Sequence, residues 1–252
     1  MNLKNKTALV TGASRGIGRA IALNFAGAGA NVIVHYNKDK CAAEKTIQEM
    51  PGGQHTLIQA KMEDPQSLQT LVDQMIQMYG RIDILVNNAG IYHTYQIQDI
   101  SYSQWQNFWH KTLSVNLFGA ANLSFLIAKE MIKNKEGRII NISSRGAFRG
   151  EPTAIEYGAS KAGMNAMGQS MAVALAPFGI YVFTIAPGFV KTDMTESILK
   201  SPAGDAVRKQ SPLERVVDVV ELAKTALFLA AEAPPAMTGC IIDVNGASYL
   251  RT

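Results

Sequence analysis

The chain contains 252 residues, of which 47% are hydrophobic, and carries a formal net charge of +4 at pH 7. A chain of this length and apolar content can bury a large core, and its charged fraction of 17% excludes an intrinsically disordered protein. The basic residues are scattered along the chain, which argues against a nucleic-acid-binding surface because such surfaces cluster Lys and Arg.

The two cysteines, Cys41 and Cys240, lie far apart, and neither has a second Cys or a His at metal-ligand spacing. We therefore expect no disulfide, no metal site and a reduced, cytoplasmic chain. The opening Met1–Val10 runs directly into a strand pattern, without the apolar core and cleavage site of a signal peptide. Apolar runs of ~20 residues without a charge are missing, so the sequence predicts no membrane partner.

Short apolar runs rich in β-branched residues alternate with amphipathic helical patterns along the whole chain. The expected strands are Thr7–Val10, Asn31–His35, His55–Gln59, Ile82–Asn87, Arg138–Ser143, Tyr181–Ile185 and Cys240–Val244. The expected helices are Gly18–Gly29, Cys41–Met50, Pro65–Tyr79, Tyr102–Lys133, Ile155–Pro177 and Asp218–Ala231. This alternation predicts an α/β fold in a single domain of residues 1–252. Its doubly wound parallel β-sheet, a Rossmann fold, would carry helices on both faces.

The segment Gly188–Glu214 breaks this alternation and is rich in Pro, Ser and Thr. It follows directly on the end of an expected strand, where loops of α/β proteins carry function. We interpret this long interruption as a substrate lid, residues 188–214, within the same domain.

A glycine-rich loop joins the first expected strand to the first expected helix. It reads Thr11-Gly12-Ala13-Ser14-Arg15-Gly16-Ile17-Gly18. Glycines let the backbone turn sharply and approach a pyrophosphate, whose charge the helix N-terminus stabilises. The loop can also be a plain turn without a ligand, but its place at the first strand–helix junction favours a dinucleotide site. The candidate contacts are Gly12, Ser14, Arg15, Gly16, Ile17 and Gly18.

Several later motifs, together with this loop, resemble the short-chain dehydrogenase/reductase family in order and spacing. They are Asn87-Asn88-Ala89-Gly90, Asn116, Ser144, Tyr157-Gly158-Ala159-Ser160-Lys161 and Pro187-Gly188. The resemblance extends from about Lys6 to about Tyr249. It implies an oxidoreductase that transfers hydride reversibly between a nicotinamide cofactor and a carbonyl or secondary alcohol.

Tyr157 and Lys161 lie four residues apart on an expected helix, so their side chains share a face. A free phenol has a pKa near ~10 and is a poor base at neutral pH. We expect the Lys161 ammonium to lower the pKa of Tyr157, which can then exchange a proton with the substrate oxygen. Because ordinary amphipathic helices also show this spacing, the neighbouring motifs decide the interpretation.

The strand Arg138–Ser143 ends at the sheet edge where open α/β sheets bind ligands. The resemblance implies that Ser144, thirteen residues before Tyr157, holds the substrate oxygen, while Ser143 is a structural neighbour. It also implies that Lys161 binds the nicotinamide ribose. Asn116 would anchor a water that passes protons between Lys161 and solvent, although it can instead be a locally satisfied polar residue. Further cofactor contacts are expected from Asn88, Ala89, Gly90, Pro187, Gly188, Val190 and Thr192.

The end of the second strand bears on the choice of cofactor. NAD-specific members place an Asp there for the adenosine ribose, and Tyr36 stands at that position. Three residues can bind a 2′-phosphate through charge-assisted hydrogen bonds, or form a solvated polar turn: Arg15, Asn37 and Lys38. We expect NADP(H) in preference to NAD(H). Lys61 replaces the Asp that often meets the adenine, and Asp64 lies out of register.

The expected substrate-lining segments are Ile91–Ser101, Arg145–Glu156 and Gly188–Glu214. Arg145 and Arg149 can meet the anionic tail of a thioester-linked acyl group or remain solvated. In length and general motifs the chain is similar to the family's 3-oxoacyl-acyl carrier protein reductases, but the usual Thr-Arg-Asp after Asn-Asn-Ala-Gly is missing. Sugar, polyol, cyclic ketone and steroid substrates stay open.

A different class of function is a dinucleotide-sensing regulator that keeps the fold without catalysis. That hypothesis predicts damage to Ser144, Tyr157 or Lys161, and all three are intact. The helices Tyr102–Lys133 and Ile155–Pro177 carry more small and apolar residues than one sheet face needs. This surplus predicts close contacts across a two-fold axis, and the resemblance implies a homotetramer or a dimer.

Overall fold

The computed structural model describes residues 1–251, and every side chain among them except those of residues 193 and 194. Seven strands form one parallel sheet in the order β3-β2-β1-β4-β5-β6-β7. The strands are β1 (Thr7–Val10), β2 (Asn31–Tyr36), β3 (Thr56–Gln59), β4 (Ile84–Asn87), β5 (Gly137–Ile142), β6 (Ile180–Pro187) and β7 (Ile241–Val244). The doubly wound α/β fold expected from the alternation is confirmed.

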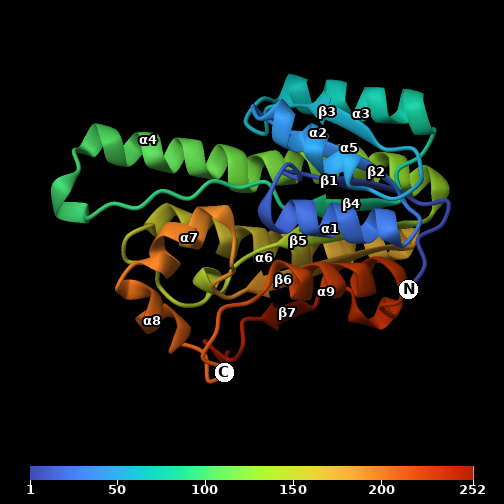
Figure 1. Ribbon diagram of the computed structural model, residues 1–252. Helices are drawn as coiled ribbons and strands as arrows, with labels where there is room; N and C mark the ends of the chain where they lie inside the picture. Colours follow the sequence, from blue (N-terminus) through green and yellow to red (C-terminus); the bar gives the residue numbers. More distant parts are fainter. Residues whose placement is uncertain (252) are drawn as a thin grey trace.

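Helices cover both faces of this sheet (Figure 1). They are α1 (Gly16–Gly27), α2 (Lys40–Gln48), α3 (Pro65–Tyr79), α4 (Tyr102–Leu113), α5 (Ala120–Asn134), α6 (Ile155–Leu175), α7 (Asp193–Lys200), α8 (Ala203–Arg208) and α9 (Val219–Ala231). Helices α1, α2 and α9 contribute to the core on one face, and α3, α5 and α6 contribute to the core on the other.

Successive residues of a strand point to opposite faces, so each inner strand supplies both cores. In β1, Ala8 and Val10 belong to the cluster shared with α1 and α9, whereas Leu9 belongs to the cluster shared with α3 and α5. This two-sided burial explains why the strands are continuously apolar in the sequence. It also leaves the carboxyl edge of the sheet as the place where polar residues gather.

Helices α4 and α5 form one continuous helical run that extends beyond the sheet as an arm (Figure 1). A π-helical turn, Ser114–Gly119, joins them. By length and composition alone the run Tyr102–Asn134 can cross a membrane, with a mean hydropathy of 1.2 in its most apolar window. Of that window, 44% is buried inside the protein.

The expected lid segment, residues 188–214, contains the two short helices α7 and α8. The sequence pattern did not predict them, because they are only 8 and 6 residues long. A parallel bridge between Val190 and Val217 closes the base of the segment. Seven residues of the segment line the same cavity as the strand ends: Gly188, Phe189, Val190, Thr192, Thr195, Ile198 and Gln210.

Candidate active site

A cavity of about 1190 Å³ opens along the carboxyl ends of the central strands. It is large enough for a dinucleotide together with a small substrate, since pockets for drug-sized ligands occupy roughly 300–1,000 Å³. Most of the expected cofactor residues line it: Gly12, Ser14, Arg15, Gly16, Ile17, Asn37, Lys38, Asn88, Ala89, Gly90, Pro187, Gly188, Val190 and Thr192. Ser144, Tyr157 and Lys161 line it too, whereas Gly18, Tyr36 and Asn116 do not.

The glycine loop fits a pyrophosphate in its conformation and in its contacts. Gly12 and Gly16 have φ values of +62° and +56°, which favour glycine. A Cβ at Gly12 would lie 3.0 Å from the Ala89 Cα, and one at Gly18 would overlap the Asn88 amide. Helix α1 begins without a side-chain cap, so its first N–H groups are available to an anion at the cavity wall.

His35 is a residue of this site that the sequence analysis missed. Its Nδ1 accepts a hydrogen bond from the Gly12 N–H at 3.0 Å, and its Nε2 lies 3.0 Å from the Ala60 carbonyl oxygen. Because that carbonyl can only accept, Nε2 carries the proton. Burial lowers the pKa of His35 to about 4, so the ring is neutral at physiological pH. The imidazole therefore ties the glycine loop to β2 and to the end of β3. Its only sequence signal is a polar residue inside an apolar strand.

The adenosine end of the cavity differs in part from the expectation. Arg15, Asn37 and Lys38 line the wall, but the Tyr36 side chain is packed into the hydrophobic core. Asp39 lines the wall as well and caps α2, accepting a hydrogen bond from the Ala42 N–H at 2.9 Å. This carboxylate opposes the positive charges beside it.

The residues after β3 provide the adjacent wall, which the motifs did not reveal. Met62 and Glu63 line the cavity, while Lys61 does not. The Lys61 N–H donates to the Ser67 hydroxyl at 2.9 Å. Asp64 caps α3 by accepting from the Gln66 N–H at 3.0 Å, which agrees with its being out of register for adenine.

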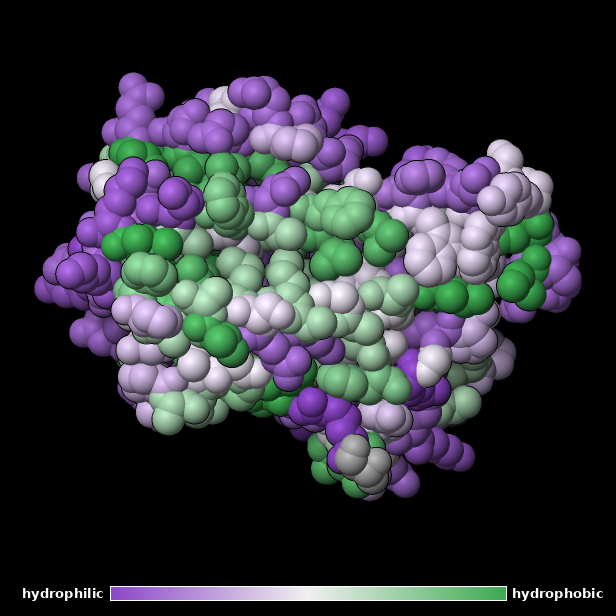
Figure 2. Space-filling model, turned by 180° about the vertical axis from the view of Figure 1, so that it is seen from behind, coloured by the Kyte–Doolittle hydropathy of each residue, from purple (hydrophilic) through white to green (hydrophobic). Residues whose placement is uncertain are grey.

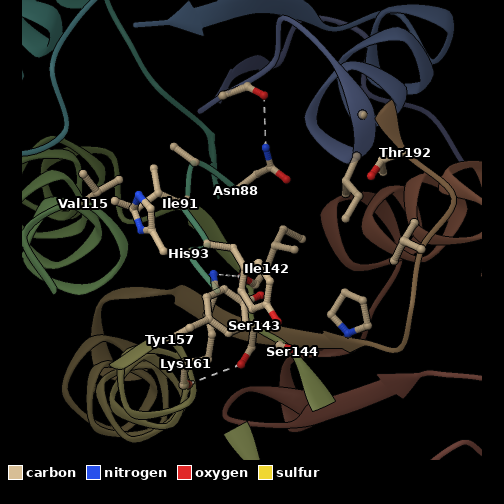
Figure 3. Close-up of a pocket in the computed structure, with 18 of the residues that line it drawn as sticks. Asn88, Ile91, His93, Val115, Ile142, Ser143, Ser144, Tyr157, Lys161 and Thr192 are labelled. Atoms are coloured by element: carbon tan, nitrogen blue, oxygen red, sulfur yellow. Dashed lines mark hydrogen bonds between the residues drawn. The ribbon is translucent and has the colours of Figure 1, made fainter. Parts of the chain in front are cut away.

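Ser144, Tyr157 and Lys161 come together where β5 ends against the start of α6 (Figure 3). The Ser144 hydroxyl accepts a hydrogen bond from the Gly146 N–H at 3.0 Å. The Lys161 ammonium donates to the Ile142 carbonyl at 2.8 Å and lies 5.8 Å from the centre of the Tyr157 ring. Ser143 donates to the Lys161 carbonyl at 3.3 Å, a contact between backbone and buried side chain that suits a structural neighbour.

The titration of these groups differs from the expectation for Tyr157. Burial raises the pKa of Tyr157 to about 12, although the hydrogen bond with Ser144 acts in the opposite direction. The net lowering of this pKa expected from Lys161 is therefore not found in the protein without cofactor, because removal of the phenolate from water dominates. Burial also lowers the pKa of Lys161 to about 8.

Asn116 lies behind the cavity wall, in the π-helical turn between α4 and α5. Its Oδ1 accepts from the Ile91 N–H at 2.8 Å, and its Nδ2 donates to the Ile91 carbonyl at 2.9 Å and to the Ser160 hydroxyl at 3.2 Å. These bonds fix the segment after β4 against α6, so Asn116 positions the wall of the site. Its expected role as a water anchor stays a prediction.

Aromatic side chains line the cavity beside Tyr157. The Tyr92 ring meets the Tyr157 ring edge-on, with centroids 4.9 Å apart. His93, shown in Figure 3, and Phe189 continue this wall. Arg145 also lines it and is only 6% exposed, so it is not one of the solvated loop charges.

A glycine loop at an uncapped helix and a Ser–Tyr–Lys cluster in one cavity are the features of a dinucleotide-dependent oxidoreductase. Residues 6–203 match the family model described as short chain dehydrogenase. The chain is 36% identical over 248 residues to the 3-oxoacyl-acyl-carrier-protein reductase FabG of Staphylococcus epidermidis, covering 98% of this chain and 100% of that protein. Identity to the Escherichia coli FabG is 35% over 250 residues, covering 99% and 100% respectively.

A solved short chain dehydrogenase from Burkholderia cenocepacia, in complex with NADP, has a TM-score of 0.89 to this structure. The two chains are 30% identical, and the match covers 98% of this chain and 99% of that one. This chain therefore belongs to the short-chain dehydrogenase family and is an oxidoreductase. The family resemblance seen in the sequence motifs is confirmed.

Proposed function

We propose that the protein reduces a carbonyl compound with NADPH and catalyses the reverse oxidation with NADP⁺, using Tyr157 as acid and base. The observation that carries this proposal is the meeting of Ser144, Tyr157 and Lys161 on one wall of the cavity that also contains the glycine loop. When bound, the nicotinamide cofactor supplies the hydride that reaches the carbonyl carbon.

The three side chains divide the work at the carbonyl oxygen. Ser144 donates a hydrogen bond to it and fixes its position beside the phenol. Tyr157, with a pKa raised by burial to about 12, is protonated at neutral pH and gives its proton to the oxygen as the hydride arrives. Lys161 supplies positive charge that stabilises the phenolate left behind. Asn116 holds Ile91 and Ser160, and thereby the wall around these groups.

The preference for NADP(H) rests on the charges at the adenosine end. Arg15 and Lys38 line the wall there, and Tyr36 leaves the end of β2 without a carboxylate. The relative bound to NADP supports the same cofactor. Asp39 opposes it, but its carboxylate is engaged in capping α2. We expect the wild type to have a lower dissociation constant for NADPH than for NADH, and Arg15→Ala to lose this difference. A lower dissociation constant for NADH that stays the same in Arg15→Ala would contradict the proposal.

The mechanism is tested by Tyr157→Phe, which keeps the ring and removes the proton. We expect its dissociation constant for NADPH to stay within about threefold of the wild type, while turnover falls by about 10²–10⁴-fold because general acid catalysis is lost. Carbonyl reduction at the wild-type rate in Tyr157→Phe would contradict the mechanism.

The substrate of the wild type is sought by assaying ketones, aldehydes, sugars and acetoacetyl thioesters with NADPH.

A second candidate is the reduction of 3-oxoacyl groups carried on acyl carrier protein. The observation in its favour is the 36% identity to FabG over nearly the whole of both chains. Turnover of an acetoacetyl thioester well above that of simple ketones would support it. The missing Thr-Arg-Asp after Gly90 stands against it.

We further propose that the protein assembles as a homotetramer or dimer through α5 and α6. Phe118, Phe125 and Val173 are exposed large hydrophobic residues of this part of the chain. Figure 2 shows apolar residues gathered on the face seen from behind, where α5 and α6 lie. A second copy would remove them from water. Light scattering of the purified protein measures its assembly.

Both cysteines are free, which supports a reducing cytoplasmic compartment.

A further inference from the structure

Two arginine side chains converge on one neutral oxygen beside the proposed reaction centre. Arg145 follows Ser144 in the chain, and its Nη2 donates to the Gln210 side-chain oxygen at 2.5 Å. The Arg149 Nη1 lies 3.4 Å from the same oxygen. Arg145, Arg149 and Gln210 all line the cavity that contains Tyr157. The two arginines therefore belong to the cavity that contains the proposed acid and base.

Neither of these guanidinium groups has a carboxylate partner among the described side chains. Five of the seven other arginines do form such pairs, namely Arg19, Arg81, Arg208, Arg215 and Arg251, whereas Arg15 and Arg138 have none among the described side chains. Glu151 acts on Arg145 and Arg149 through space but forms no ion pair with either. Glu151 lines the same cavity and offsets part of this charge. Even so, a buried cation without a direct ion pair is costly, and a second cation nearby adds repulsion.

The titration of Arg145 reflects the same imbalance. Burial lowers its pKa, and Arg149 lowers it further. Arginine stays protonated in proteins, so the charge persists and has to be met by something else. A fixed guanidinium with free donors is suited to a planar carboxylate, which it can bind through two parallel hydrogen bonds.

We propose that Arg145 and Arg149 bind a carboxylate of the substrate, so that the protein acts on small oxo acids and the corresponding hydroxy acids. This inference rests on the proposed carbonyl reduction at Tyr157. Ser144 holds the carbonyl oxygen, and the next residue in the chain holds the carboxylate. The Phe189 ring, whose centre is 5.8 Å from the Arg145 guanidinium carbon, provides an apolar surface for the carbons between the two groups. The groups that would recognise the carbonyl and the carboxylate therefore line the same cavity.

The test compares acids with their own methyl esters, using NADPH as the reductant. The pairs are acetoacetate with methyl acetoacetate, levulinate with methyl levulinate, and 5-oxohexanoate with methyl 5-oxohexanoate. We expect the wild type to prefer at least one acid over its ester by about 10-fold or more in kcat/KM, since a charge-assisted pair in a cavity supports that discrimination. The acid with the largest ratio of kcat/KM to that of its ester indicates how far apart the carbonyl and the carboxylate are held.

Variants of Arg145 test whether this residue causes the preference for the acid. In Arg145→Met we expect kcat/KM for the preferred acid to fall about 10- to 100-fold, and that for its ester to change by less than about threefold. Arg145→Lys should restore part of the preference, because it restores the charge without the planar fork. Lys133→Met, which removes an exposed positive charge from α5, is the matched control and should leave the ratio unchanged.

A measurement without turnover separates binding from folding. We expect the melting temperature of Arg145→Met to equal or exceed that of the wild type, because an unpaired buried charge is removed. With NADP⁺ present, the preferred acid should raise the melting temperature of the wild type and leave that of Arg145→Met unchanged. A melting temperature that falls in Arg145→Met, with an unchanged ratio of acid to ester, would make Arg145 a structural residue and overturn the inference.

The remaining outcomes distinguish this inference from the function on which it rests. Equal rates on every acid and its ester overturn the carboxylate site while leaving carbonyl reduction intact. The same holds if acetoacetyl thioesters are far better substrates than any acid. If dihydroxyacetone phosphate is preferred over all the acids, the anion is a phosphate and the carboxylate assignment is wrong. If neither acids, esters, thioesters nor sugars are reduced with NADPH or NADH, the proposed function itself fails.

Discussion

An arginine lies at or just beyond each end of β5, half-buried at the amino end and buried at the carboxyl end, and the two differ in their partners. At the amino end, the Arg138 Nη1 donates to the Leu229 carbonyl at 2.7 Å and to the Ala233 carbonyl at 2.9 Å. Just beyond the carboxyl end, Arg145 has one amide oxygen shared with a second arginine. Burial lowers the pKa of both.

The contrast separates stability from function along a single strand. Arg138 joins β5 to the end of α9, because its Nη1 donates to two backbone carbonyl groups, as in a structural contact. Arg145 sits at the edge where parallel sheets bind ligands, and its unmatched donors are useful only when a ligand is present. Substitutions at the carboxyl end of β5 should therefore lower turnover, whereas substitutions at its amino end should lower the free energy of unfolding.

The largest effect is expected at the carboxyl end, from Lys161→Met. Turnover should fall by about 10³-fold, because the phenolate of Tyr157 loses the charge that stabilises it. Stability should not fall, since burial already lowers the pKa of Lys161 to about 8 and the ammonium is costly to bury. Steady-state kinetics and urea unfolding of the same preparation measure both. A large loss of stability in Lys161→Met would contradict the proposed difference between the two ends of β5.

At the amino end we expect the reverse from Arg138→Met. Removing the guanidinium leaves the Leu229 and Ala233 carbonyl groups without their donor, at a cost of about 2–4 kcal/mol in the free energy of unfolding. The turnover number of the folded fraction should remain within about twofold of the wild type, because Arg138 lies at the far end of β5 from the cavity. Urea titration gives the first quantity, and active-site titration corrects the second. Unchanged stability would contradict this reading.

Acid should weaken the protein through His35. The folded pKa of about 4 is lower than the unfolded value of 6.5, so the unfolded chain binds a proton first as the pH falls. The stability contributed by neutral His35 is therefore complete above pH 6.5 and is lost between 6.5 and about 4. The loss is on the order of 3 kcal/mol at most. Unfolding of the wild type and of His35→Phe across this range measures it. Identical pH profiles for the two would refute the assignment.

The smallest effect concerns cofactor affinity, again through His35. His35→Phe removes both the acceptor for the Gly12 N–H and the donor to the Ala60 carbonyl. We expect KM for NADPH to rise by about 10-fold with little change in kcat, because the glycine loop is less well held. His35→Gln, which has both an acceptor and a donor, should recover much of the affinity. A purely structural histidine would show no such recovery in KM.

Much of this fold follows from the sequence because its physical causes are local. Strands buried on both faces must be continuously apolar, and the turns between strand and helix must carry glycine or caps such as Asp64. The grouping of Ser144, Tyr157 and Lys161 follows as well, because parallel strands end at one edge and residues four apart share a helix face.

The parts that escaped prediction depend on partners far away in the chain. His35 reads as a stray polar residue, since its two partners lie 23 and 25 positions away. The position of Tyr36 in the core and the pKa of Tyr157 depend on burial, which spacing does not reveal. Arg145 looks like any loop charge until its 6% exposure is known.

The π-helical turn at Ser114–Gly119 has a consequence for how this arm of the protein tolerates insertions and deletions. An α-helix advances about 100° per residue, and a π-helical turn holds one residue more than an α-helical turn. That extra residue is absorbed within the turn, so losing it would let the run close into a regular α-helix in which α4 and α5 keep nearly the same relative orientation. The effect of such a deletion would be confined to the turn that carries Asn116 and its bonds to Ile91. The arm that reaches past the cavity would keep its direction.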